Sequence, residues 1–334
     1  MKKLTLDEIR ATPAKDLVDG LRNRSFSLLQ SMGFHKLKAE MNFTGFVCWA
    51  IIALTGLRKE VKPQPHMINL SSPGRVKVAR ILKKAAPCSV KGYFQPVTGG
   101  RVIGFNHPSL GEILRFIYLC VADGKDSVNA FVGKKSLFPV NLPWYEAIMP
   151  IVHELEEIGI FVMPVITPST RRKMAKKANA EQMEVIDDLS KQLNTLYLQK
   201  CAEFIKANDI IWVAPTATRQ RTVFKSVACY SGSEAIEPQT MTLLALALKR
   251  AKITDCSFQV VGVVPDEDFK SGLNLFKPYK LGVGDCLSME TAIEMVRGKS
   301  NECVGSKFEF TFLHRIMNVV NDLGGAELLA PDKF

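Results

Sequence analysis

The residues best suited to chemistry lie together in the segment Asn106-His107-Pro108-Ser109-Leu110-Gly111-Glu112. A carboxylate beside a histidine holds one ring nitrogen and fixes the tautomer, so the other nitrogen can remove a proton from a hydroxyl. An apolar run precedes His107 and a helical pattern follows it, which places Glu112 in the first helical turn. We predict that His107 is a general base and that Glu112 orients it.

The segment supplies a base and its orienting acid, but the chain has no Gly-x-Ser-x-Gly motif to supply a serine nucleophile. The attacking oxygen is therefore expected to belong to the substrate, and the reaction to be a direct transfer. Two structural alternatives stay open: Ser109 and Glu112 have the spacing of a helix capping box, and Asn-His-Pro-Ser suits an ordinary turn.

Short apolar runs that alternate with helical patterns must position this segment. The runs read as strands are Arg101–Phe105, Val128–Val132, Ile160–Ile166, Ile210–Ala214, Phe258–Val264 and Lys307–Phe312. The helical patterns are Leu110–Ala122, Trp144–Glu157, Glu181–Ala207 and Pro238–Ala251. The alternation predicts an α/β fold whose central, mostly parallel sheet is flanked by helices. Sites form at the carboxyl ends of such strands, where His107 is expected to stand.

The N-terminal part of the chain has a different character. Residues 1–60 read as a helical, membrane-associating region, in which Leu17, Leu21, Leu28 and Leu29 suggest an amphipathic stripe. Residues 41–57 carry no charge and are followed by Arg58 and Lys59. This length suits a short membrane span, an interfacial anchor or a buried core helix. We expect residues 61–334 to form the α/β domain, and the protein to sit at the cytoplasmic face of a membrane.

The His107 segment resembles the first motif of the glycerolipid acyltransferases, the glycerol-3-phosphate and lysophosphatidic acid acyltransferases. The family's signature is His, four residues, then Asp; Glu at the last position is similar to the late acyltransferases of lipid A biosynthesis. Further resemblances follow in the family's order over roughly residues 100–265: Gly133–Pro139 with Gly159–Val162, then Ile211–Arg219, then Val260–Pro265. The resemblance implies an O-acyltransferase with catalytic His107 and Glu112, helped by Asn106 or Ser109 in oxyanion binding or orientation.

This chain also departs from the family pattern. Thr216 and Ala217 replace the Glu and Gly of the third motif, and the Arg that closes the second motif is absent near Pro164. In the family these groups help to hold a phosphate, so the acceptor is left open among a lysophospholipid, glycerol phosphate or a related lipid. The remaining candidates for binding substrate or phosphate are Lys134, Arg171, Arg172, Thr218 and Arg219.

The charge balance favours anionic partners. The chain has 44 Lys plus Arg against 33 Asp plus Glu, a net charge of +11. The expected partners are acyl-CoA or acyl carrier protein as donor, a lipid acceptor and an anionic membrane surface. No zinc site is expected, because the eight cysteines stand singly, without zinc-ligand spacing, and the expected transfer reaction needs no metal or cofactor. The alternatives are an inactive lipid-binding relative and a nucleic-acid-binding protein; the latter lacks any recognisable binding module.

Overall fold

The computed structural model describes residues 2–34, 80–84, 87–95, 98–107, 111–121, 131, 134–215, 240–265, 278–298 and 306–324. The chain forms two compact units. The first combines residues 1–74 with 137–200, and the second combines 75–136 with 201–334. The predicted boundary near residue 60 and the apolar segment 41–57 lie outside the described residues.

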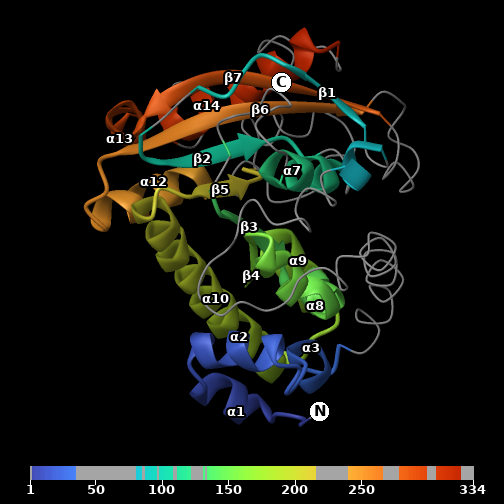
Figure 1. Cartoon of the computed structure of the whole chain (residues 1–334). Helices are drawn as coiled ribbons and strands as arrows, with labels where there is room; N and C mark the ends of the chain where they lie inside the picture. The colour runs from blue at the N-terminus through green and yellow to red at the C-terminus, as the bar shows by residue number, and fades with distance from the viewer. Residues whose placement is uncertain are drawn as a thin grey trace. The chain divides into compact units, whose positions relative to one another are not determined.

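The first unit is mainly helical (Figure 1). It contains α1 (Leu6–Ala11), α2 (Ala14–Arg22), α3 (Leu28–Ser31), nearly all of β3 (Ser136–Asn141), α8 (Leu142–Glu157), β4 (Ile160–Val165), α9 (Pro168–Ala175) and most of α10 (Ala180–Lys206). The leucines of the predicted stripe, Leu17 and Leu21 on α2 and Leu28 and Leu29 on α3, are all buried.

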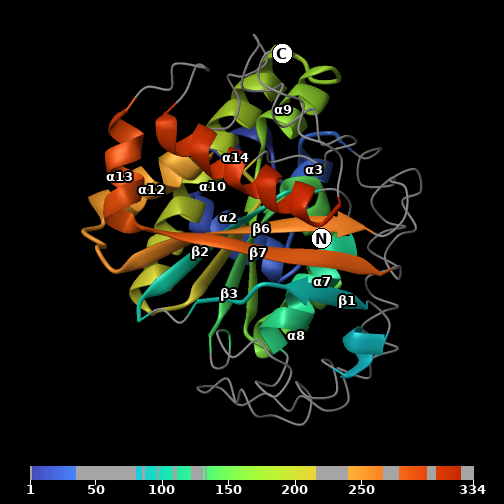
Figure 2. The ribbon, with the colours of Figure 1, turned by 90° about the horizontal axis from the view of Figure 1, so that it is seen from above.

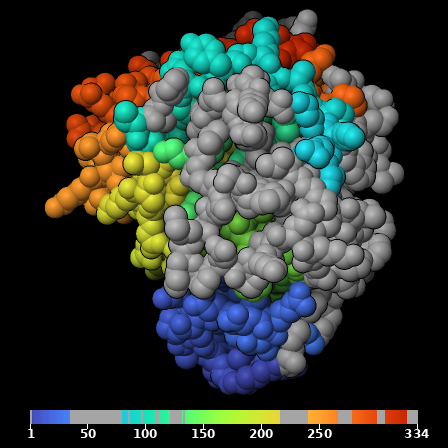
Figure 3. All heavy atoms as spheres, in the orientation of Figure 1, coloured from blue at the N-terminus to red at the C-terminus, as the bar shows by residue number. Residues whose placement is uncertain are grey.

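Side chains of α8 tie the N-terminal helices into this unit. The Glu146 carboxylate accepts hydrogen bonds from the Ser27 hydroxyl and from the Leu29 N–H, the latter at 3.0 Å, at the start of α3. Arg22 at the end of α2 pairs with Glu156. Atoms of residues 2–34 also form part of the molecular surface, drawn as blue spheres in Figure 3. Residues 2–34 are therefore anchored by packing and by polar contacts.

The second unit is built on a sheet. Five strands lie in the order β1-β7-β6-β2-β5, namely β1 (Cys88–Lys91), β2 (Gly100–Phe105), β5 (Ile210–Val213), β6 (Cys256–Pro265) and β7 (Tyr279–Ser288). The helices of this unit include α7 (Gly111–Val121), α12 (Thr240–Arg250), α13 (Met289–Arg297) and α14 (Lys307–Asp322), and residues 80–84 and the end of α10 are also helical. β2 pairs in parallel with β5 and β6, and β1 with β7, while β6 and β7 are antiparallel. The sheet is thus mostly parallel, as predicted.

The strand ends nearest the site lie at one edge of the sheet. The parallel strands β2, β5 and β6 end at this edge, and β7 begins there, because Tyr279 is the register partner of Pro265. Tyr279 is also paired with Cys88, the first residue of β1. All six residues of β2 are buried, as expected of a central strand covered on both faces.

Helix α14 lies across β6 and β7 (Figure 2). Glycines occupy several positions of the sheet surface that it covers. A Cβ atom at Gly104 would lie 2.1 Å from the Phe312 ring, and one at Gly282 would lie 2.4 Å from Val319. A Cβ at Gly262 would likewise come within 2.7 Å of Val319. Glycine at these three positions lets the helix approach the sheet closely.

Most predicted elements are confirmed. Strands were expected at four places where β2, β4, β5 and β6 occur, and helices where α7, α8, α10 and α12 occur. The strand predicted at Val128–Val132 falls almost wholly outside the described residues. Strands β1, β3 and β7 and helices α9 and α13 were not predicted.

The strand predicted at Lys307–Phe312 is wrong, because these residues begin α14. Phe308, Phe310 and Phe312 alternate with polar residues, which imitates a strand. The Ser306 hydroxyl, however, accepts a hydrogen bond from the Glu309 N–H and so caps a helix. Phe308, Phe312 and Ile316 recur every four residues and are all buried. The four-residue spacing of buried side chains, and not the alternating pattern, therefore matches the structure of this segment.

None of the helices within the described residues is long and apolar enough to cross a membrane.

Candidate active site

The turn that follows β2 is fixed by the side chain of Asn106. Its Nδ2 donates a hydrogen bond to the Val263 carbonyl at 2.8 Å, and its Oδ1 accepts one from the Val263 N–H at 2.7 Å. The side chain thus extends the pairing of β2 with β6 by one position. Because Asn106 is buried, these two bonds hold the backbone immediately before His107 in place.

The structure brings His107 and Glu112 together. The Glu112 carboxylate contacts Nδ1 of His107. Glu112 lies in the first turn of α7 and is 0% exposed, whereas the His107 side chain is 19% exposed. An ionised carboxylate on Nδ1 places the proton of the neutral ring there and leaves the lone pair on Nε2. The pair therefore presents a base to the surface with its orienting acid behind it.

A cluster of aromatic side chains supports this turn from below. The Phe105 ring meets the His107 ring edge-on, with centroids 6.4 Å apart, and packs on Phe116 of α7 at 4.5 Å. Phe116 stacks on Trp212 of β5 at 4.6 Å, and Phe131 lies 5.7 Å from Trp212. Such rings resist displacement because they bury large areas. His107 thus stands on a rigid apolar base.

A buried arginine lies on the same helix as Glu112. Arg115 is 0% exposed, and its guanidinium carbon lies 4.1 Å from the centroid of the Tyr279 ring. Burial lowers the pKa of Arg115, while the charges of Tyr279, Cys88 and Glu112 raise it. Burial also raises the pKa of the Cys88 thiol, against the effect of Arg115. Sequence reasoning missed this group, although a single arginine within the apolar run of residues 113–121 was a visible signal.

Lys134 is not brought to His107. Its ammonium donates to the Asn208 carbonyl, just before β5 begins. The neighbouring Lys135 N–H donates to Asp209 at 2.8 Å, and burial raises the pKa of that carboxyl. Arg101 pairs with Ile210 in the register, so Lys134 lies at the amino end of these strands. His107 lies beyond their carboxyl ends, about 20 Å away at 3.3 Å per residue.

The other predicted binding residues are placed as follows. Arg171 and Arg172 belong to α9 in the first unit. Arg171 makes a two-pronged ion pair with Asp187, with Nε–Oδ1 at 2.5 Å and Nη2–Oδ2 at 2.9 Å. Ser109, Thr218 and Arg219 lie outside the described residues.

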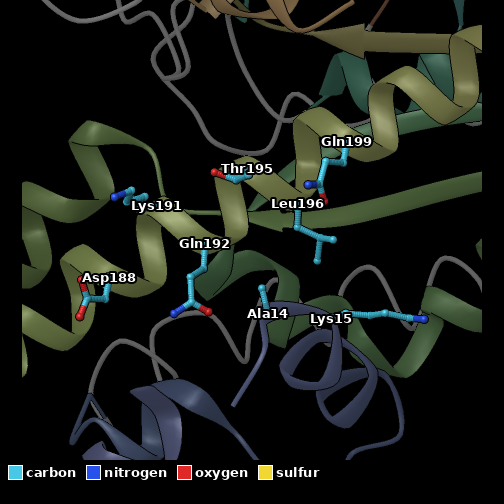
Figure 4. Close-up of a pocket in the computed structure, with 8 residues that line it drawn as sticks. All are labelled: Ala14, Lys15, Asp188, Lys191, Gln192, Thr195, Leu196 and Gln199. Atoms are coloured by element: carbon cyan, nitrogen blue, oxygen red, sulfur yellow. The ribbon is translucent and has the colours of Figure 1, made fainter. Parts of the chain in front are cut away.

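The first unit has a shallow depression of about 530 Å³ between α2 and α10 (Figure 4). It is lined by Ala14, Lys15, Asp188, Lys191, Gln192, Thr195, Leu196 and Gln199. This lining includes no histidine or cysteine, so no acid–base pair like that of His107 and Glu112 is present there. Across the described ranges, no group of three or more potential metal ligands comes together.

The sequence matches no protein-family model and no curated protein. A solved structure that resembles the chain is the 1-acyl-sn-glycerophosphate (LPA) acyltransferase PlsC from Thermotoga maritima. The match covers 87% of this chain and 98% of that one, with 12% sequence identity and a TM-score of 0.39. A likeness this loose carries no functional conclusion, so the function has to be inferred from the chain's own residues.

Proposed function

We propose that this protein is an O-acyltransferase that moves a fatty acyl group from a thioester onto a hydroxyl, with His107 as the general base. The observation that supports it is the contact between Glu112 and Nδ1 of the partly exposed His107. A hydrolase would add a nucleophilic serine to such a pair. Since the sequence has no serine elbow, the acceptor hydroxyl is the natural nucleophile.

In the proposed reaction, Nε2 of His107 removes the proton of the acceptor hydroxyl as its oxygen attacks the thioester carbonyl carbon. A carbon–oxygen bond forms and the carbonyl oxygen takes up negative charge. The carbon–sulfur bond then breaks, and the proton on Nε2 passes to the departing thiolate. Glu112 stabilises the imidazolium that exists between these two proton transfers. We assign orientation of the turn to Asn106, whose side chain pairs with Val263.

The donor in this proposal is acyl-CoA or acyl carrier protein, and the acceptor is a lysophospholipid, glycerol phosphate or a related lipid. The basic helix α9 supports an anionic membrane surface as the place of reaction. Arg171, Arg172, Lys173, Lys176 and Lys177 are all exposed there. Basic residues near an anionic bilayer contribute about 1 kcal/mol each to binding.

The test is acyl transfer by the purified protein from acyl-CoA, and separately from acyl carrier protein, to a panel of these acceptors, followed by mass spectrometry of the products. We expect a product one acyl chain heavier with the wild type. His107→Ala should reduce the rate by about 10² to 10⁴-fold, the range for loss of a general base. His314→Ala is the matched control, since His314 is exposed on α14, and it should retain wild-type activity.

Near-wild-type activity in a folded His107→Ala protein would overturn the assignment of the base. If the wild type binds the lipids but transfers no acyl group from either donor, the chain is an inactive lipid-binding relative. The replaced third motif, with Thr216 and Ala217, is the feature that favours this second candidate.

A further inference from the structure

The outward side of helix α7 is aliphatic. Ile113 is 37% exposed, and Leu114 and Ile117 are half-buried. At about 100° per residue, these three side chains lie within about 100° of one another around the helix axis, and together they form the α7 outer face. The two charged residues of the helix, Glu112 and Arg115, are both 0% exposed. A surface helix ordinarily shows the reverse arrangement, with its charged residues toward water.

The α7 outer face begins beside the proposed catalytic pair. Ile113 directly follows Glu112, whose carboxylate contacts Nδ1 of His107. Ile117 lies four residues, or about 6 Å, farther along the helix. The His107 side chain is itself 19% exposed. A partner that covers the α7 outer face is therefore close to the base.

A lipid bilayer is the partner whose chemistry fits this face. Ile113, Leu114 and Ile117 offer hydrocarbon and no charge or hydrogen bond, so transfer out of water is favourable for them. The net charge of +11 attracts the chain to anionic lipid. Helix α7 has 11 residues and is about 16 Å long, too short to cross a hydrocarbon core of about 30 Å. Contact with a bilayer would therefore be lateral, at the depth of the headgroups.

We propose that the α7 outer face rests in the interfacial layer of an anionic bilayer, so that a lipid acceptor reaches Nε2 of His107 from the membrane. The hydroxyl of such an acceptor lies at headgroup level, the same depth as an interfacial helix. The use of this contact in catalysis rests on the proposed function, whereas the contact itself requires no reaction. Because the contact is apolar, added salt should not weaken it, in contrast to the attraction of basic residues.

The matched control for Ile113 is Leu243 on α12, which is 52% exposed. The helices of these two residues lie on opposite faces of the sheet. A Cβ at Gly104 would point at Phe312 of α14, whereas the next residue of β2, Phe105, packs on α7. Helix α12 contacts α14. Leu243 is thus an exposed aliphatic residue on the other side of the second unit.

The experiment is flotation of the full-length protein with phosphatidylcholine–phosphatidylserine vesicles. Ile113→Gln and Leu243→Gln each replace an exposed aliphatic side chain and leave the net charge unchanged. We expect Ile113→Gln to weaken binding about tenfold and Ile113→Gln/Ile117→Gln about 100-fold, equally at low and physiological salt. Leu243→Gln should bind like the wild type. Equal losses in the two single variants, or no loss in folded Ile113→Gln, would overturn the proposal.

A second measurement covers glutamine variants that do not fold. Ile113→Trp bound to vesicles of brominated lipid should show more fluorescence quenching than the wild type, which has three tryptophans. Leu243→Trp should show no increase.

The remaining outcomes separate this contact from the chemistry. If Ile113→Trp shows no added quenching, or the wild type does not bind the vesicles, the proposal is overturned. If Ile113→Gln keeps its vesicle binding while acyl transfer falls, the face holds an acyl chain or another protein segment, which also overturns it. If the wild type binds through this face but transfers no acyl group, the proposed function fails and the membrane contact stands.

Discussion

Glu112 is the central residue of the site, because it links the partly exposed His107 ring to the buried interior. Glu112→Gln keeps the shape of the side chain but removes its charge. We expect the turnover number for acyl transfer to fall by about 10² to 10⁴-fold, since the imidazolium loses its counter-ion. Steady-state kinetics with saturating donor would measure this effect.

Glu309→Gln is the control for Glu112→Gln. Glu309 is also buried, but its carboxylate accepts from the Thr242 N–H at 2.9 Å, at the start of α12. Its replacement should lower stability and leave turnover unchanged. Equal losses of turnover in the two glutamine variants would show that the proposed acyl transfer depends on buried charge in general and not on the contact with His107.

Residues differ in how far the sequence could reveal them. The pairing of His107 with Glu112 was predictable, because both lie in one short segment whose geometry is local. The stacking of Arg115 on Tyr279 joins residues from distant parts of the chain, and only the sheet register brings them together. Lys134 was assigned to substrate from the resemblance of Gly133–Pro139 to a family motif, and the structure places it at the amino end of β5.

At the scale of elements, the close packing of α14 on the sheet predicts that added volume at Gly104 destabilises the fold. Gly104→Ala would place a methyl group 2.1 Å from the Phe312 ring. Overpacking of this kind costs about 1–3 kcal/mol, because the helix has to shift or the ring has to leave its preferred rotamer. We expect the free energy of unfolding, measured by urea denaturation, to fall by that amount. Acyl transfer should also weaken, since Gly104 lies three residues before His107.

Gly298→Ala is the matched control for Gly104→Ala. A Cβ at Gly298 would meet its nearest neighbour, the Lys307 Cβ, at 3.5 Å, which is an ordinary contact. The backbone there also has a negative φ of −80°. We expect a change within about 0.5 kcal/mol. Equal losses in the two variants would mean that the Gly104 surface is not tightly packed against α14.

The elements that were not predicted from the sequence, or were predicted wrongly, have local patterns that differ from those of their secondary structure. β7 contains Gly282 and Gly284, and such residues weaken a strand pattern although the close approach of α14 requires them. The start of α14 showed two periodicities at once, and only its cap and its continuation to Ile316 distinguish them. Long apolar runs such as β2 and β6 were recognisable because burial on both faces leaves no alternation to misread.

At the scale of the whole molecule, basic residues that contribute to the net charge of +11 cluster in α9 and the residues after it. We expect Lys173→Glu/Lys176→Glu/Lys177→Glu to weaken binding to phosphatidylserine-containing vesicles by at least about 100-fold, at about 1 kcal/mol per lysine. Vesicle flotation at low and physiological salt would measure it. Neutral phosphatidylcholine vesicles should show no difference.

The control for this surface is Lys3→Glu/Lys15→Glu/Lys191→Glu, which changes the net charge equally at three other exposed lysines. Its binding should fall much less. If both triple variants lose affinity alike, the membrane responds to the total charge of the protein, and α9 has no special part in membrane binding.

Because β2 lies between two strands that are translated later, the site can form only late in synthesis. Both neighbours of β2 come much later in the chain, and the bond that Asn106 makes to Val263 spans 157 positions. While the ribosome is still making the middle of the protein, His107 has been translated but its supporting strand has no partners. Contacts of such long range fold slowly. A nascent chain released before β6 would therefore be incomplete at the site, because β2 would still lack this neighbouring strand.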